Sequence, residues 1–435
     1  MKYLLIAILT FFSFLACYSQ TNSKITKEDA AKVLEQLSHE IEKAYLYSEK
    51  AERINIRLSK YAIELDNMTQ TEIQVFVGKV NTILFDESSD HHLKFYYDPD
   101  KFKIFQNENQ GIIDSLEREQ YRRVNFGVQK VEILSSNIGL MRLNKFQQIE
   151  DVKEVIQGAM MMLANSDAII IDLRINGGGD GRTKEFLESF FLTQEQFLKR
   201  ENQEFIEATE LEKIKKANPS CQKLELVPLY ILTGNGTFSA AEGFCYDLQQ
   251  LGRAQIIGAR TKGGGYSGSS VPLSKGFLVF IPTSGKNSPI EGVGITPDVE
   301  TSESSALLTA QKQFIDSIIS SCSDSTLISQ YRWHRETIEA SLYRNILQYE
   351  NVDRYIGQYN HGFSVELVGK ELYLVQQKKK IKSELIPINK SYFIAVDNLD
   401  FGYGNYRIQF SEDGKAKLLV NLGVKIAEMK LEKNN

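Results

Sequence analysis

The segment 232–242 carries the residue pattern with the most evident chemistry in this chain. It reads LTGNGTFSAAE, which predicts a strand, a glycine turn and a helix that starts at Ser239. At a helix N-terminus the dipole favours the negative charge that develops when a serine hydroxyl attacks a carbonyl, and the N–H of Ala240 can donate to an oxyanion. Ser239 followed three residues later by Glu242 is also a capping box. The local sequence alone slightly favours a serine that only caps its helix.

A second glycine-rich turn follows an apolar run. Residues 169–179 read IIIDLRINGGG. Glycines let a ligand approach backbone N–H groups closely, so Gly177 and Gly178 are further candidate oxyanion donors. The alternative is a plain turn between a strand and a helix. A phosphate loop does not fit, because no Gly-Lys-Ser/Thr follows. Asp172 and Arg174 are expected to hold the loop rather than to react.

Two further blocks complete an ordered set of four. Residues 258–265 read GARTKGGG and residues 289–298 read PIEGVGITPD. In this order the blocks resemble the C-terminal-processing (tail-specific) serine peptidase family, over most of residues 30–320. The stretch between His92 and a strand expected near Val131 is too short for a PDZ domain. The resemblance is therefore to the PDZ-less branch, which includes the tricorn protease core and interphotoreceptor retinoid-binding protein.

The resemblance implies a fold, an activity and a nucleophile. The fold would be α/β, of the ClpP/crotonase-like ββα-superhelix type, and the activity would be peptide-bond hydrolysis through an acyl-enzyme on Ser239, with no metal or cofactor. In the tail-specific branch the general base is a lysine 25 residues after the serine, a position that is Gly264 in this chain. Lys262 stands two residues earlier and is the less favoured alternative base.

The other branch of the family uses a histidine and a glutamate. Residues 90–93 read DHHL and resemble its Asp-x-His-Leu motif, which implies that His92 is the base. Glu291 matches the Glu-Gly-x-Gly-x-x-Pro-Asp motif and would orient the imidazole. The branch has a serine immediately before the histidine, whereas this chain has His91. A rival interpretation is a catalytically inactive protein that binds an apolar ligand or a peptide on the same scaffold.

The elements that must position these residues are expected in a helical part, an α/β part and a β-rich part of the chain. Apolar residues at three-to-four spacing predict helices within residues 25–85, the first starting near Thr26. Strands are expected at 138–143, 168–173, 229–233, 255–257 and 277–281, and helices at 150–164, 183–192, 239–251, 304–320 and 331–349. Residues 194–226 are charged and predict an irregular surface excursion. After Asp353, short apolar runs separated by glycines predict a β-rich domain, with strands at 365–367, 372–375, 392–396 and 406–410.

The expected organisation is accordingly a signal peptide at 1–19, an N-terminal helical domain at 24–92, a serine peptidase core at 93–320, a helical connector at 321–349 and a C-terminal β-rich domain at 350–435. The chain has 435 residues and a net charge of -5, so its charge does not favour nucleic acid as a partner. Peptide or protein substrates are expected. The cysteines outside the leader form neither a disulfide framework nor a zinc pattern. The sequence leaves the oligomeric state open.

The first residues predict export to the periplasm, the extracellular space or a lipid anchor at the cell envelope. Lys2 supplies a basic start, and residues 4–16 are nearly all apolar but too few to span a membrane comfortably. Cleavage after Ser19 would release a protein that begins at Gln20. Alternatively, residues 15–17 resemble a loose lipobox, which would leave Cys17 lipidated.

The prediction is tested by intact mass and N-terminal sequencing of the protein recovered from its native host. We expect an N-terminus at Gln20 or a lipid on Cys17. Protein that retains Met1 would contradict both forms of export.

Overall fold

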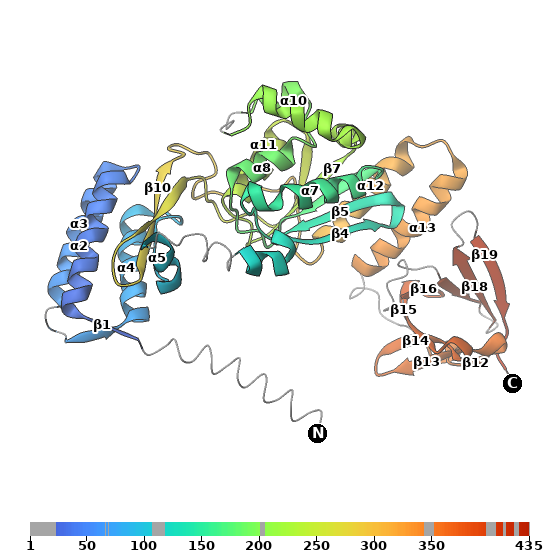
Figure 1. Ribbon diagram of the computed structural model, residues 1–435. Coiled ribbons are helices and arrows are strands. Elements are labelled where there is room, and N and C mark those ends of the chain that lie inside the picture. The colour runs from blue at the N-terminus through green and yellow to red at the C-terminus, as the bar shows by residue number, and fades with distance from the viewer. Residues whose placement is uncertain are drawn as a thin grey trace. The chain divides into compact units, whose positions relative to one another are not determined.

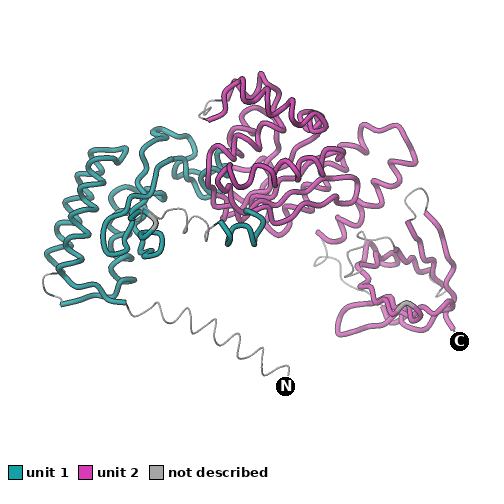
Figure 2. The backbone as a smooth tube through the Cα atoms, viewed as in Figure 1, with its two compact units in different colours: residues 1–126, 238–243, 261–295 teal, residues 127–237, 244–260, 296–435 magenta. Residues whose placement is uncertain are grey.

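The computed structural model describes residues 23–65, 67, 69–106, 118–200, 205–342, 352–396, 406–411, 415–421 and 426–434 (Figure 1). The expected signal peptide and Cys17 lie outside these residues. Two compact units share the chain: residues 1–126, 238–243 and 261–295 form unit 1, and residues 127–237, 244–260 and 296–435 form unit 2 (Figure 2). Within the described ranges, no helix combines the length and apolar character that a membrane crossing requires.

Three long helices dominate the N-terminal part of unit 1, as the apolar spacing predicts. They are α2 (Lys27–Ala44), α3 (Ser48–Leu65) and α4 (Ile73–Ser88). The hydroxyl of Thr26 accepts the N–H of Asp29 at 3.2 Å and caps α2 at the predicted start. Two short strands, β1 (Lys24–Thr26) and β2 (Gln70–Glu72), pair antiparallel. The buried faces of the helices form one apolar core, to which Leu37, Leu58 and Phe76 belong.

A small antiparallel sheet completes that core. Its strands lie in the order β3 (Lys94–Tyr97), β10 (Phe277–Ser284) and β9 (Ser267–Pro272). The short helix α5 (Pro99–Gln106) follows β3 in the chain. The Phe277 ring stacks on Phe95, with centroids 5.2 Å apart, and meets Phe76 edge-on. The strand expected at 277–281 therefore exists, but it pairs with β3 and β9 instead of joining the sheet of unit 2. His92 comes two residues before β3, so this sheet fixes the chain beside it.

Unit 2 is built on a six-stranded sheet. Its order is β11 (Val299–Glu300), β8 (Ala254–Gly258), β7 (Leu229–Thr233), β6 (Ala168–Asp172), β5 (Ile138–Leu143) and β4 (Val128–Leu134), and only β4 runs antiparallel to its neighbour. All five residues of β6 are buried, which is why the strand reads as a continuous apolar run. The associated helices are α7 (Ile149–Leu163), α8 (Gly181–Glu188), α11 (Ala240–Gln250) and α12 (Ala306–Ser321). The predicted α/β class is confirmed.

The prediction of an irregular excursion at 194–226 is wrong in one respect. The described part of this segment contains the helices α9 (Gln194–Leu198) and α10 (Ala208–Ala217) and a 3₁₀ stretch at Pro219–Glu225. A capping box between Thr193 and Gln196 starts α9, and Leu211 and Ile214 are buried on α10. Because most residues of α10 are charged, its few apolar residues do not form a clear three-to-four spacing in the sequence.

The C-terminal part of unit 2 is an antiparallel meander of eight strands, as the glycine-punctuated pattern predicts. The strands are β12 (Gly357–Tyr359), β13 (Phe363–Val368), β14 (Glu371–Gln376), β15 (Ile381–Asn389), β16 (Tyr392–Val396), β17 (Tyr406–Phe410), β18 (Ala416–Asn421) and β19 (Ile426–Leu431). A bridge between Tyr359 of β12 and Lys433, two residues after β19, closes the meander into a ring. Aromatic residues such as Tyr355, Phe393 and Phe410 fill its interior.

The helix α13 (Ser325–Leu342) precedes this domain and is anchored to it by one buried arginine. Arg407 on β17 pairs with Glu336, donates to the carbonyl of Trp333 and lies 3.8 Å from the Trp333 ring centroid. The expected connector helix at 331–349 thus starts earlier, at Ser325, and its residues 343–349 lie outside the described part of the chain.

Candidate active site

A buried carboxylate fixes the backbone that carries His92. Asp90 Oδ1 accepts the N–H of His92 at 2.7 Å and the N–H of Leu93 at 3.2 Å, and Asp90 Oδ2 accepts the hydroxyl of Tyr45 at 3.0 Å. Tyr45 ends α2, while Leu93 is buried in the core of unit 1. The Asp-x-His-Leu pattern is therefore a locked turn between α4 and β3, in which the aspartate holds the main chain and the leucine anchors it.

The imidazole of His92 lies in an aromatic environment and faces one carboxylate. Its ring stacks on Phe238, with centroids 4.4 Å apart, and its Nδ1 is 3.9 Å from Oε2 of Glu291. Both ring nitrogens are buried and make no hydrogen bond with the described residues. Burial lowers the pKa of His92 to about 4, against the opposing charge of Asp90. The imidazole is consequently neutral at pH 7, with a free lone pair that can take up a proton.

Glu291 is the partner of that imidazole. Its Oε2 accepts the N–H of Gly265 at 2.6 Å, whereas its Oε1 is buried without a partner among the described residues. Burial raises the pKa of Glu291 to about 7, and the charges of Asp90 and Glu242 act in the same direction. The contact between His92 and Glu291 is thus not a standing ion pair at neutral pH. Instead, a neutral imidazole faces a carboxyl group whose pKa is raised to about 7.

Ser239 immediately follows Phe238 and has an unusual backbone conformation. Its φ is 55°, in the left-handed region that non-glycine residues seldom adopt. An ordinary N-cap residue is extended, so the simple capping interpretation does not account for this turn. In the first turn of α11, the N–H groups of Glu242 and Gly243 donate to the main-chain carbonyl of Ser239. Left-handed strain at a half-exposed serine on a strand-to-helix turn is typical of a nucleophile elbow.

Glu242 does more than the capping box predicts. One oxygen accepts the N–H of Ser239 at 3.0 Å, which is half of that motif. The same carboxylate also accepts the N–H of Gly263 at 2.7 Å, the N–H of Gly264 at 2.6 Å and the hydroxyl of Thr261. Glu242 is fully buried. It therefore joins the Ser239 turn to the glycine-rich loop.

The packing around Gly264 leaves no room for a side chain at this position. A Cβ atom on Gly264 would lie 2.2 Å from the Phe238 ring and 2.5 Å from Cε1 of His92. The His92 ring thus occupies the space that a side chain at position 264 would need. Lys262, the alternative base, is exposed, with its Nζ 5.6 Å from the Phe238 centroid. An exposed ammonium lacks the desolvation that a lysine base requires.

The second glycine loop belongs to unit 2 and is held from within that unit. Asp172 accepts hydrogen bonds from Arg142 at 2.7 Å and from Arg174 at 2.8 Å, which agrees with the architectural role expected for Asp172 and Arg174. The N–H of Gly178 donates to Oδ1 of Asn176 at 2.8 Å. Of the two oxyanion donors expected in this loop, the N–H of Gly178 is therefore already hydrogen-bonded. In the described chain, nothing accepts from the N–H of Gly177.

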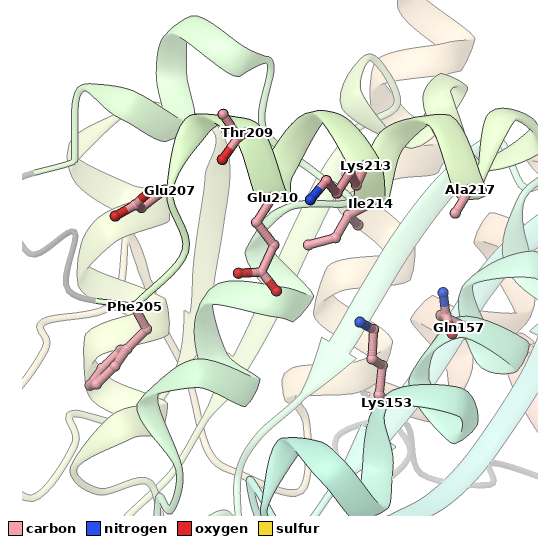
Figure 3. A pocket seen from close by; sticks show the side chains of 9 residues that line it. All are labelled: Lys153, Gln157, Phe205, Glu207, Thr209, Glu210, Lys213, Ile214 and Ala217. Atoms are coloured by element: carbon pink, nitrogen blue, oxygen red, sulfur yellow. The ribbon is translucent and has the colours of Figure 1, made fainter.

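One hollow of unit 2 is lined by none of these residues. It measures about 620 Å³ and lies between α7 and α10 (Figure 3). Its polar lining mixes Lys153 and Lys213 with Glu207 and Glu210, beside the ring of Phe205. No nucleophile–base pair is among its lining residues, so its lining does not support hydrolytic chemistry.

Sequence reasoning missed three contributors to the site. Asp90 was passed over as part of a motif, Glu242 was treated only as a cap, and Phe238 was not considered. The signals were present in part: Asp90 stands two residues before His92, and Phe238 directly precedes Ser239. The stacking of Phe238 on His92 joins residues 146 positions apart and is visible only in the fold.

Comparison with known proteins relates the chain to a peptidase family. Residues 137–301 match Peptidase family S41. A carboxyl-terminal-processing protease of Picosynechococcus sp. (strain ATCC 27264 / PCC 7002 / PR-6) is 27% identical over 165 residues, which cover 37% of this chain and 38% of that protein. A probable CtpA-like serine protease of Staphylococcus haemolyticus (strain JCSC1435) is 26% identical over 197 residues, 43% of this chain and 38% of the relative. The chain thus spans well under half the length of these relatives.

Among solved structures, the tricorn protease aligns with 63% of this chain and 34% of its own, at 13% identity and a TM-score of 0.40. The family match covers the strands from β5 to β11 and the segment that carries Ser239, Gly264 and Glu291. The chain therefore contains a peptidase family S41 domain and is homologous to carboxyl-terminal-processing and CtpA-like serine proteases.

Proposed function

We propose that the protein is a serine peptidase in which Ser239 attacks the scissile carbonyl and His92 is the general base. The observation that carries this proposal is the neutral, buried imidazole of His92, stacked on the residue next to Ser239 and facing Glu291 at 3.9 Å. A base, a carboxylate that orients it and a strained serine are the parts that acyl transfer requires. The family relationship supports the same reaction class.

The path of the proton is set by the two ring nitrogens of His92. Nδ1 of His92 faces Glu291, so Nε2 is the nitrogen left to accept the proton of the Ser239 hydroxyl. The attack forms an Oγ–C bond, and the same proton then passes from Nε2 to the leaving amine as the peptide bond breaks. A water molecule, deprotonated by Nε2, then attacks the acyl-enzyme carbonyl. The ester bond to Oγ breaks, the proton returns to Oγ, and the acid product leaves. Glu291 stabilises the imidazolium that exists between these steps.

The proposed oxyanion donors are the N–H of Ala240 and one N–H of the glycine loop. The N–H of Ala240 lies in the first turn of α11, where backbone donors have no intrahelical acceptor. For the glycine loop, Gly177 is the better candidate, because the N–H of Gly178 is engaged by Asn176. Peptides or proteins are the proposed substrates, and export with or without a lipid on Cys17 remains part of the proposal.

Removal of the nucleophile gives the most direct test. Ser239→Ala should abolish peptide hydrolysis and labelling by a fluorophosphonate, because loss of a nucleophile can cost about 10⁶-fold in rate. The melting temperature should stay close to that of the wild type, since the helix N–H groups bond the main-chain carbonyl of Ser239. A wild-type protein that neither labels nor cleaves any member of a peptide library would favour the rival ligand-binding function.

The identity of the base is tested by parallel kinetics on three variants. His92→Ala should lose nearly as much activity as Ser239→Ala, because nucleophile and base act as a unit. Glu291→Gln should lose less. Lys262→Met should remain within about tenfold of the wild type, or roughly 1.4 kcal/mol. An inactive Lys262→Met beside an active His92→Ala would instead assign a displaced serine–lysine dyad.

The packing at position 264 yields a third test. Gly264→Ala adds a methyl group that would lie 2.5 Å from the His92 ring, so the ring must move. We expect kcat to fall by about 10²-fold, since small misplacements of a catalytic group can cost that much. Gly78→Ala on α4 is the matched control, because its Cβ would meet nothing within 4 Å. Equal activity of the two variants would show that the position of the ring does not matter.

A further inference from the structure

Three potential metal ligands converge beside the Ser239 turn. Asp90, His92 and Glu291 each offer one ligand atom, and these atoms lie within 4.8 Å of one another. Asp90 and His92 are buried, and the side chain of Glu291 is only 9% exposed. The three come from one short turn and one distant loop of unit 1, so the fold and not the local sequence brings them together.

Each of the three retains binding capacity. Neither nitrogen of His92 and neither lone pair of Glu291 Oε1 is matched by a donor or acceptor of the described residues, although all three atoms are buried. Asp90 accepts from His92, Leu93 and Tyr45, which uses three of the roughly four lone pairs of a carboxylate. Buried polar atoms without partners are costly, and a bound ion is one of the few ways to satisfy several at once.

We propose that Asp90, His92 and Glu291 bind a divalent transition-metal ion, zinc by the chemistry of its ligands, and that binding withdraws His92 from catalysis. One imidazole nitrogen with two carboxylates is a donor set that suits zinc, with a fourth position left for water. Magnesium and calcium prefer oxygen ligands throughout. Zinc binds these atoms at about 2.0–2.2 Å, so the ligands must close by about 1 Å. The Oε1 atom of Glu291, which no hydrogen bond holds, can supply that movement.

The inhibitory half of this proposal rests on the proposed peptidase function, whereas the binding half does not. Zinc would take the lone pair of Nδ1, and the ring proton of the neutral imidazole would then lie on Nε2. Nε2 would therefore have no lone pair with which to remove the serine proton. No covalent bond forms or breaks, and a chelator should restore the free site.

The binding half is tested on the full chain with Ser239→Ala, which keeps all three ligands. Zinc titrated by calorimetry should bind once per chain, and cobalt at the same site should give the visible absorption of a four-coordinate ion. Adding His92→Ala or Glu291→Gln should weaken zinc binding by about 100-fold or more, because loss of an outer-shell partner alone costs 10–100-fold. Melting curves check that both variants fold.

His91→Ala is the matched control, since His91 is the exposed neighbour and packs its ring on Phe85. It should bind zinc as the parent does. Zinc affinity that is unchanged in His92→Ala and Glu291→Gln, or equally lost in His91→Ala, would overturn the site.

The inhibitory half is tested on the wild type. Zinc should block fluorophosphonate labelling of Ser239, EDTA should restore it, and magnesium should have no effect. Undiminished labelling in a chain saturated with zinc would overturn this half. A chain that never labels would instead refute the peptidase function, and the calorimetry on Ser239→Ala would still decide the metal site.

Discussion

The buried carboxylate of Glu242 is the constraint on which the site depends. It accepts three main-chain N–H groups and one hydroxyl, and no cation neutralises it among the residues that the structure describes. A buried charge is tolerated when several donors solvate it, and here the first turn of α11 adds its dipole. Because the donors come from both the Ser239 turn and the glycine-rich loop, neither can shift without leaving part of the charge unsatisfied.

The N-terminal helices help to hold His92 beside the glycine-rich loop. With the loop fixed, Gly264 leaves room for an aromatic ring, and His92 fills it against Phe238. Tyr45, at the end of α2, bonds the aspartate that holds the His92 backbone. The helices therefore help to support His92, and the apolar core that joins them to β3 and β10 determines how well the imidazole is positioned.

The sequence anticipates most elements but only part of the site. Fully buried strands such as β6 appear as apolar runs, and the amphipathic helices α2 and α4 appear through their spacing. The resemblance nominated His92 and Glu291, which the fold brings to 3.9 Å. The three additional bonds of Glu242 lie 19 to 22 residues away, beyond any local pattern. The partners of β10 and the helices of 194–226 were missed because tertiary packing, and not periodicity, selects them.

The closure of the C-terminal ring has a consequence for the order of folding. Its first strand meets the main chain of residues 432–434, through bonds from Asn360 to Glu432 and from Asn434 to Gln358. Some seventy residues must therefore be present before the ring can close, and these contacts are among the most non-local within the C-terminal domain. Until they form, β12 exposes an unpaired edge to other polypeptides. A chain truncated before residue 432 would carry that edge, so the ring can close only when the last residues of the domain are present.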